Sequence, residues 1–111
     1  MRMLMKVNIP VESGNAAAQN GSLGTTVQRI LEELKPEAAY FVSENGERTG
    51  YVVFDMKESS DLTAIAEPWF LAFNARVTVA PTMNAADLAK GAAGIEKAVK
   101  GYGKAAAAAA G

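Results

Sequence analysis

The residues best suited to bind or transform a ligand sit in segments where polar and aromatic side chains alternate with apolar ones. The candidate ligand-binding residues are Lys6, Asn8, Tyr40, Tyr51, Asp55 and Arg76. Cationic, amide and hydroxyl groups gathered on one surface could bind a small polar or anionic organic molecule, with the tyrosine rings as flat walls. Asp55 is also the candidate for a catalytic role, as a general base.

Two interpretations of these charges stay open. In the first, Lys6 and Arg76 bind an anionic ligand, or one of them stabilises an oxyanion while Asp55 removes a proton. In the second, the charges pair with one another inside an interface, because an unpaired charge there would be costly. Glu44 and Glu47 flank a turn, and we expect both to be simply exposed.

Composition excludes several classes of site. The 111 residues include neither cysteine nor histidine, and the formal net charge is −1. Disulfides, thiolate nucleophiles, Cys/His zinc sites, Ser-His-Asp triads and histidine-ligated haem are therefore excluded. We expect no cofactor and no metal, and the charge balance gives no reason to expect a nucleic-acid partner. Without a signal-peptide pattern or an apolar run of roughly 20 residues, we expect a cytoplasmic protein with no membrane partner.

Alternating apolar and polar residues predict four strands. The first covers Arg2 to Ile9 and ends at Pro10, which cannot donate to a strand ladder. A hairpin over Ala38 to Met56 supplies the second and third, with its turn at Asn45 and Gly46. The fourth lies within Asn74 to Ala80 and stops at Pro81.

Three helices are predicted between and after these strands. A helical stripe from Leu23 to Leu34 follows a short, weaker first turn near Ser13, with a break near Gly21. A second helix spans Leu62 to Phe73, and Pro68 should kink or divide it.

The third helical stripe runs from Leu88 to Tyr102. Gly91 and Gly94 soften it, and Asn84 with Asp87 resembles a capping box at its start.

The element order is therefore β-α-β-β-α-β followed by a C-terminal helix. This order predicts an α+β, ferredoxin-like fold with a four-stranded antiparallel sheet in the order 4-1-3-2. We expect residues 1–103 to form one such domain. The poly-alanine tail at 104–111 could extend the last helix, could be added sequence, or could stand for residues of uncertain identity, and it carries no functional weight.

The two faces of this sheet differ in character. The face that packs on the helices should carry the apolar set Met3, Met5, Val7, Ile9, Phe41, Val52, Phe54, Val77 and Val79. The other face mixes apolar, tyrosine and charged residues, namely Leu4, Lys6, Asn8, Tyr40, Val42, Glu44, Tyr51, Val53, Asp55, Arg76, Thr78 and Ala80. A mixed face of this kind suggests partial covering by a second copy, which would form a closed dimeric α+β barrel. The alternative is an exposed sheet with scattered apolar residues. Trp69 is expected in the core or an interface.

Several motifs carry a resemblance. Met-Leu-Met-Lys-Val at Met3–Val7, Leu-Lys-Pro-Glu-Ala-Ala-Tyr-Phe at Leu34–Phe41, Ala-Glu-Pro-Trp-Phe at Ala66–Phe70 and Val-Ala-Pro-Thr-Met at Val79–Met83 resemble a family of small bacterial proteins of unknown function. That family resembles the dimeric α+β-barrel superfamily, which includes monooxygenases, isomerase-like enzymes and ligand-sensing domains. The resemblance implies a fold and a homodimer but selects no reaction.

Three functions follow as hypotheses. The first is a homodimer that binds a small polar or anionic organic ligand in a cavity between two sheets. The second is a cofactor-free isomerase or monooxygenase acting on a small carbonyl or aromatic substrate. The third is a purely structural dimer module.

Overall fold

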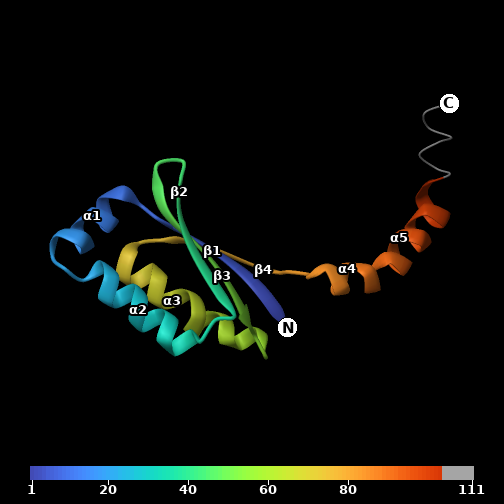
Figure 1. Cartoon of the computed structure of the whole chain (residues 1–111), viewed down its shortest axis with the longest axis horizontal. Coiled ribbons are helices and arrows are strands. Elements are labelled where there is room, and N and C mark those ends of the chain that lie inside the picture. The colour runs from blue at the N-terminus through green and yellow to red at the C-terminus, as the bar shows by residue number, and fades with distance from the viewer. Residues whose placement is uncertain (104–111) are drawn as a thin grey trace.

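A four-stranded antiparallel sheet carries its helices on one face (Figure 1). The computed structural model describes residues 1–103, so the predicted poly-alanine tail lies outside the described residues. The strands are β1 (Arg2–Ile9), β2 (Ala38–Glu44), β3 (Glu47–Asp55) and β4 (Arg76–Pro81), in the order β2-β3-β1-β4. This is the predicted order 4-1-3-2, read from the other edge of the sheet.

The hairpin turn follows directly from its residue types. Asn45 and Gly46 both have positive φ, 53° and 76°, which is the geometry of a tight two-residue hairpin. Glu44 therefore lies opposite Glu47, and Tyr40 lies opposite Tyr51. The predicted hairpin is confirmed, and its register places both tyrosines on the same face of the sheet.

Three helices cover the other face, namely α1 (Val11–Gln19), α2 (Leu23–Leu34) and α3 (Leu62–Phe73), the last preceded by the 3-10 turn η1 (Ser59–Asp61). The first is a full helix rather than the predicted short turn, and it ends where Gly21 takes a φ of 81°. The third runs through Pro68 undivided. Ala66 and Trp69 on either side of the proline are buried, so packing outweighs the lost backbone hydrogen bond.

The core lies between the sheet and these helices. Its fully buried large side chains are Trp69, Phe54, Phe73, Met5, Val7 and Val52. Along β1 buried and half-buried residues alternate strictly, so the predicted division of this strand between two faces is confirmed. Phe41 is a correction, because 54% of its surface is exposed although it faces the helices. β2 is an edge strand, and no helix covers this ring completely.

The face without helices is called the open face below. From β1 it carries Leu4, Lys6 and Asn8. The strand registers show which residues of β2, β3 and β4 point to the same face. These are Tyr40, Val42, Glu44, Glu47, Thr49, Tyr51, Val53, Asp55, Arg76, Thr78 and Ala80.

A C-terminal arm projects from the β4 edge of the sheet (Figure 1). It consists of α4 (Ala85–Lys90), α5 (Ala92–Ala98) and the π-helical turn η2 (Val99–Gly103), so the predicted single helix is divided at Gly91. The chain measures 62 × 31 × 23 Å, with a radius of gyration of 19.0 Å. A compact domain of 100 residues would have a radius of about 13 Å. The arm therefore lies outside the packed body. Within residues 1–103, no helix combines the length and apolar character needed to cross a membrane.

Candidate ligand-binding site

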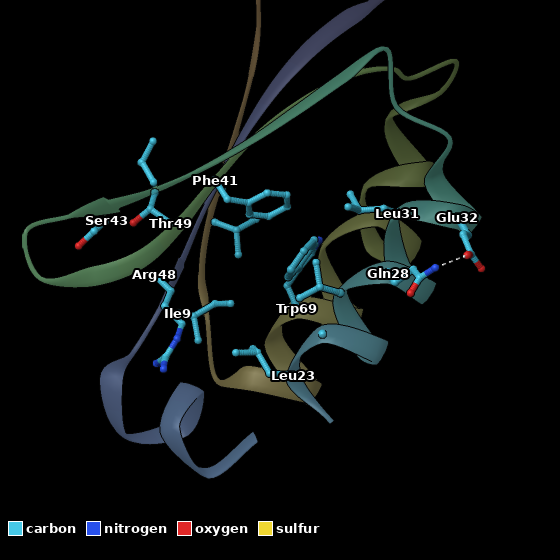
Figure 2. Close-up of a pocket in the computed structure, with 15 residues that line it drawn as sticks. Ile9, Leu23, Gln28, Leu31, Glu32, Phe41, Ser43, Arg48, Thr49 and Trp69 are labelled. Carbon is cyan, nitrogen blue, oxygen red and sulfur yellow. Dashed lines mark hydrogen bonds between the residues drawn. The ribbon is translucent and has the colours of Figure 1, made fainter. Parts of the chain in front are cut away.

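The largest described cavity is a cleft between the β2–β3 hairpin and α2, with a volume of about 800 Å³. We call it the hairpin cleft (Figure 2). Its apolar walls come from β1, α2, β2 and α3, through Val7, Ile9, Leu23, Val27, Leu31, Phe41 and Trp69. The apolar residues of the helical stripe predicted for residues 23–34 thus line the cleft as well as pack against the core.

Phe41 and Gly50 explain why the cleft exists. They are cross-strand partners on the helix-facing side of the hairpin. A Cβ atom at position 50 would lie 3.0 Å from Cε1 of Phe41 and 3.3 Å from its Cδ1. Only glycine therefore lets the ring lie over β3 without displacement. In Figure 2 this ring stands across the cleft from Leu31 on α2.

Trp69 forms the floor of the hairpin cleft. It is the only tryptophan of the chain and is 1% exposed. Its ring centroid lies 6.1 Å from that of Phe73, with the planes tilted by 39°. The indole Nε1 is buried and has no hydrogen-bond partner among the described residues. A buried donor left unsatisfied costs roughly 1–3 kcal/mol. A ligand whose acceptor reached this nitrogen would remove that cost and bind more tightly.

Polar groups stand at the rim of the cleft. On α2, Gln28 Nε2 donates to Glu32 Oε1 at 3.2 Å (Figure 2). On the hairpin side, Arg48 Nη1 donates to Asn15 Oδ1 at 3.1 Å, which fixes the guanidinium above α1. Apolar walls with a few polar groups at the mouth are typical of small-molecule sites.

The open face holds the residues that the sequence singled out, and Lys6 and Tyr51 meet there at Glu44. The Lys6 ammonium pairs with the Glu44 carboxylate and lies 5.8 Å from the centre of the Tyr51 ring. The Tyr51 hydroxyl donates to the other carboxylate oxygen. Hydrogen bonding to Glu44 raises the pKa of both Lys6 and Tyr51, and contact with Lys6 lowers the pKa of Glu44.

Asn8, Arg76 and Tyr40 lie beside this cluster. Asn8 Nδ2 donates to Thr49 Oγ1 at 3.1 Å, and Asn8 is the cross-strand neighbour of Arg76. The Arg76 guanidinium pairs with Glu47, and Tyr40 is 68% exposed opposite Tyr51. Glu44 and Glu47 were expected to be simply exposed, and that expectation is wrong. Both are half-buried, because each neutralises a cation of the open face.

Asp55, the candidate general base, lies away from the other candidate residues of the open face. It lies four residues along β3 from Tyr51, which is about 13 Å of strand. Its carboxylate accepts a hydrogen bond from the Met1 ammonium at 2.8 Å, and this contact lowers the pKa of Asp55. The charges of this face do pair, but with Glu44, Glu47 and the N-terminal ammonium rather than among Lys6, Arg76 and Asp55.

The sequence reasoning missed the hairpin cleft altogether. Phe41 was expected in the core, and Trp69 in the core or an interface; Trp69 is a core residue, 1% exposed, as expected. The available signal was the glycine at position 50, since a glycine inside a strand often marks a close approach of another group. No cluster of three or more metal-binding side chains is found among residues 1–103.

Comparison with known proteins adds a family. No curated protein sequence matches the chain. Among solved structures, one similar chain is a formyltetrahydrofolate deformylase from Pseudomonas putida KT2440, with a TM-score of 0.47 and 17% identity. The match covers 74% of this chain and 29% of that chain, so this chain spans less than a third of the enzyme's length. The family model described as "Domain of unknown function (DUF3303)" matches residues 1–96, and the chain belongs to this family.

Proposed function

We propose that the protein binds a small molecule in the hairpin cleft, and that this ligand is a mainly apolar organic molecule with a hydrogen-bond acceptor. One observation carries the proposal. A cleft of about 800 Å³ is lined by Trp69, whose buried indole N–H has no hydrogen-bond partner among the described residues. Ligand sites commonly have volumes of about 300–1,000 Å³ and few polar groups, and this cleft falls within that range.

The walls suggest how such a ligand would lie. A flat or aromatic body could pack against the half-exposed Phe41 ring, where offset stacking is favourable. A carbonyl or ether oxygen at the inner end would accept the hydrogen bond of Trp69 Nε1. Any polar end would point to the rim at Gln28 and Glu32.

Paired probes test the acceptor requirement. The probes are 2-acetylnaphthalene, which has a carbonyl acceptor, and 2-ethylnaphthalene, which has a similar shape without one. We expect the carbonyl compound to bind the wild type about tenfold more tightly. This is the gain in affinity expected when a ligand forms one hydrogen bond to a buried donor. Isothermal titration calorimetry on wild type and Trp69→Phe gives the comparison. The preference should disappear in the variant, whereas equal affinities in the wild type would contradict the assignment of Trp69.

We further infer that the protein is a homodimer in which two open faces meet, giving a ferredoxin-like dimeric α+β barrel. The strand order and the exposed Tyr40 and Val42 support this arrangement. The internal ion pairs of Lys6 and Arg76 support it too, because charges that are already neutralised can enter an interface at lower cost.

A polar or anionic ligand between the two sheets is the second candidate. The observation that favours it is the convergence of Lys6, Asn8, Tyr51 and Arg76 on one patch. A thermal-shift screen of anionic metabolites on wild type and on Lys6→Ala/Arg76→Ala tests this candidate. It fails if no anion stabilises the wild type more than the variant. An enzyme that uses Asp55 as its base would require a substrate cavity at the Met1 end of β3.

A further inference from the structure

A second apolar groove lies between α3 and β4, at the edge of the sheet from which the arm leaves. Its volume is about 270 Å³, and its apolar lining comes from Leu62, Ala66, Phe70, Val77 and Val79. Leu62 and Phe70 are 41% and 38% exposed. We call it the edge groove. It shares no lining residue with the hairpin cleft, so the two sites can be tested separately.

The C-terminal arm carries an apolar stripe of matching character. Its members recur in alternating steps of four and three residues along α4, α5 and η2, and these are Leu88, Ala92, Ile95, Val99 and Tyr102. The four large side chains are each more than half exposed. A stripe with this spacing is typical of a helix that packs on a partner.

The charges of the two surfaces are complementary. Residues 58–73, which include η1 and α3, contain three acidic residues and no lysine or arginine. One of these acids, Glu67, lines the edge groove. The arm, residues 85–103, contains three lysines, one aspartate and one glutamate. The arm therefore has an excess of lysines and the groove borders acidic side chains, which favours docking of the arm in this groove.

Contacts at the start of the arm direct it away from its own groove. Thr82 N donates to the Arg2 carbonyl at 3.1 Å, and Arg2 Nη1 lies 3.4 Å from Asp87 Oδ2. These contacts hold α4 beside the first residue of β1, and the arm then runs outward (Figure 1). The edge groove lies in the other direction, back along β4.

We propose that the arm of one copy docks its apolar stripe in the edge groove of a second copy, and that the exchange is reciprocal. Arm and groove both belong to the β4 edge, so one two-fold axis beside this edge serves both contacts. Reciprocal exchange also doubles the area that a single short helix could bury. The proposal does not depend on the hairpin cleft or its ligand.

Cysteine cross-linking tests this exchange directly, because the chain has no cysteine of its own. Full-length Ile95→Cys and full-length Phe70→Cys are mixed, oxidised with copper phenanthroline and separated without reductant. We expect a disulfide-linked heterodimer as the main product. In the control, Gln19→Cys on α1 replaces Phe70→Cys and should give only background cross-linking. Circular dichroism checks that each variant is folded.

Two outcomes would overturn the proposal. If the double variant Ile95→Cys/Phe70→Cys forms only an internal disulfide and the mixed single variants do not link, the arm docks on its own copy. If Ile95→Cys links only with itself, the arms pair with each other.

Sedimentation of Val99→Asp gives an independent readout. A carboxylate placed in the stripe should raise the dimer dissociation constant about tenfold or more. An unchanged constant would also overturn the proposal.

Discussion

At the scale of single residues, Phe41, Gly50 and Trp69 determine whether a ligand can be held. Gly50 leaves room for the Phe41 ring, the ring forms one wall, and Trp69 supplies a floor with an unsatisfied donor. None of the three would be singled out by charge or by a catalytic motif. The open face holds most of the polar chemistry, yet Lys6 and Arg76 each already pair with a carboxylate from the hairpin.

Gly50→Ala should reshape the hairpin cleft while leaving the fold intact. Its Cβ would meet the Phe41 ring at 3.0 Å and push it outward. We expect a change of less than about 1 kcal/mol in the free energy of unfolding, because alanine also suits a strand better than glycine. Affinity for 2-acetylnaphthalene should fall several-fold by calorimetry. Gly94→Ala, where the added atom meets nothing, is the matched control and should bind as wild type does.

Glu44→Gln should flatten the acid dependence of stability. The contacts of Glu44 with Lys6 and Tyr51 lower the pKa of its carboxyl from the ordinary value of 4.5. A carboxyl whose folded pKa is lowered contributes stability above its unfolded pKa, and loses it as the pH falls through the folded value. Urea midpoints measured between about pH 5 and pH 3 should therefore fall less in Glu44→Gln than in wild type. The exposed Glu12→Gln should retain the wild-type slope, and identical slopes for all three proteins would refute the prediction.

At the scale of elements, the sequence predicts structure that depends on local patterns well, and structure that depends on packing against distant parts of the chain poorly. The alternation of β1, the Asn45-Gly46 turn and the Asn84–Asp87 capping box are all observed, since each depends on neighbours in the chain. The extent of α1 was missed, and of the two outcomes expected at Pro68 the division of α3 is not observed, because burial against the sheet outweighs local propensity there.

The candidate site shows the same limit. The register placed Lys6, Asn8, Tyr40, Tyr51 and Arg76 on one face, as the alternation predicts. Which carboxylate each cation meets depends on side-chain reach across strands, and the sequence does not specify it. The hairpin cleft depends on a missing Cβ and on how far α2 extends over an edge strand.

Asn84→Ala should loosen α4 without unfolding the body. Asn84 Oδ1 accepts the Asp87 N–H at 2.8 Å, and Asp87 Oδ2 accepts the Asn84 N–H at 3.1 Å. Loss of such a cap costs about 1 kcal/mol. Hydrogen exchange should rise several-fold in α4 and stay unchanged in β1 and β3. Thr63→Ala on α3 is the control, and equal exchange in α4 for both variants would show that the capping box is unimportant.

At the scale of the whole molecule, an elongated chain leaves two surfaces uncovered, the open face and the stripe of the arm. Both are mixed or apolar; the proposed open-face dimer would cover the first, and the proposed exchange of arms would cover the second. Chains of about 100 residues have a high ratio of surface to volume, so association adds burial that the chain alone cannot reach.

Tyr40→Asp should weaken this dimer. The tyrosine is 68% exposed in the centre of the edge strand β2, and a carboxylate there would be buried without a partner if two open faces meet. Analytical ultracentrifugation should show a dissociation constant raised about tenfold or more. Leu71→Asp changes a residue that is 82% exposed on α3, and should leave the constant unchanged. A monomeric wild type, or equal effects of the two changes, would contradict the open-face dimer.

The indole N–H signal of Trp69 gives the most direct test of the ligand proposal. A single tryptophan means a single indole resonance in a ¹⁵N–¹H correlation spectrum of the full-length protein. On titration with 2-acetylnaphthalene, we predict that this resonance moves downfield and exchanges more slowly with water, because its donor acquires an acceptor. With 2-ethylnaphthalene it should move little. An indole resonance that responds equally to both compounds, or to neither, would contradict a ligand site above Trp69.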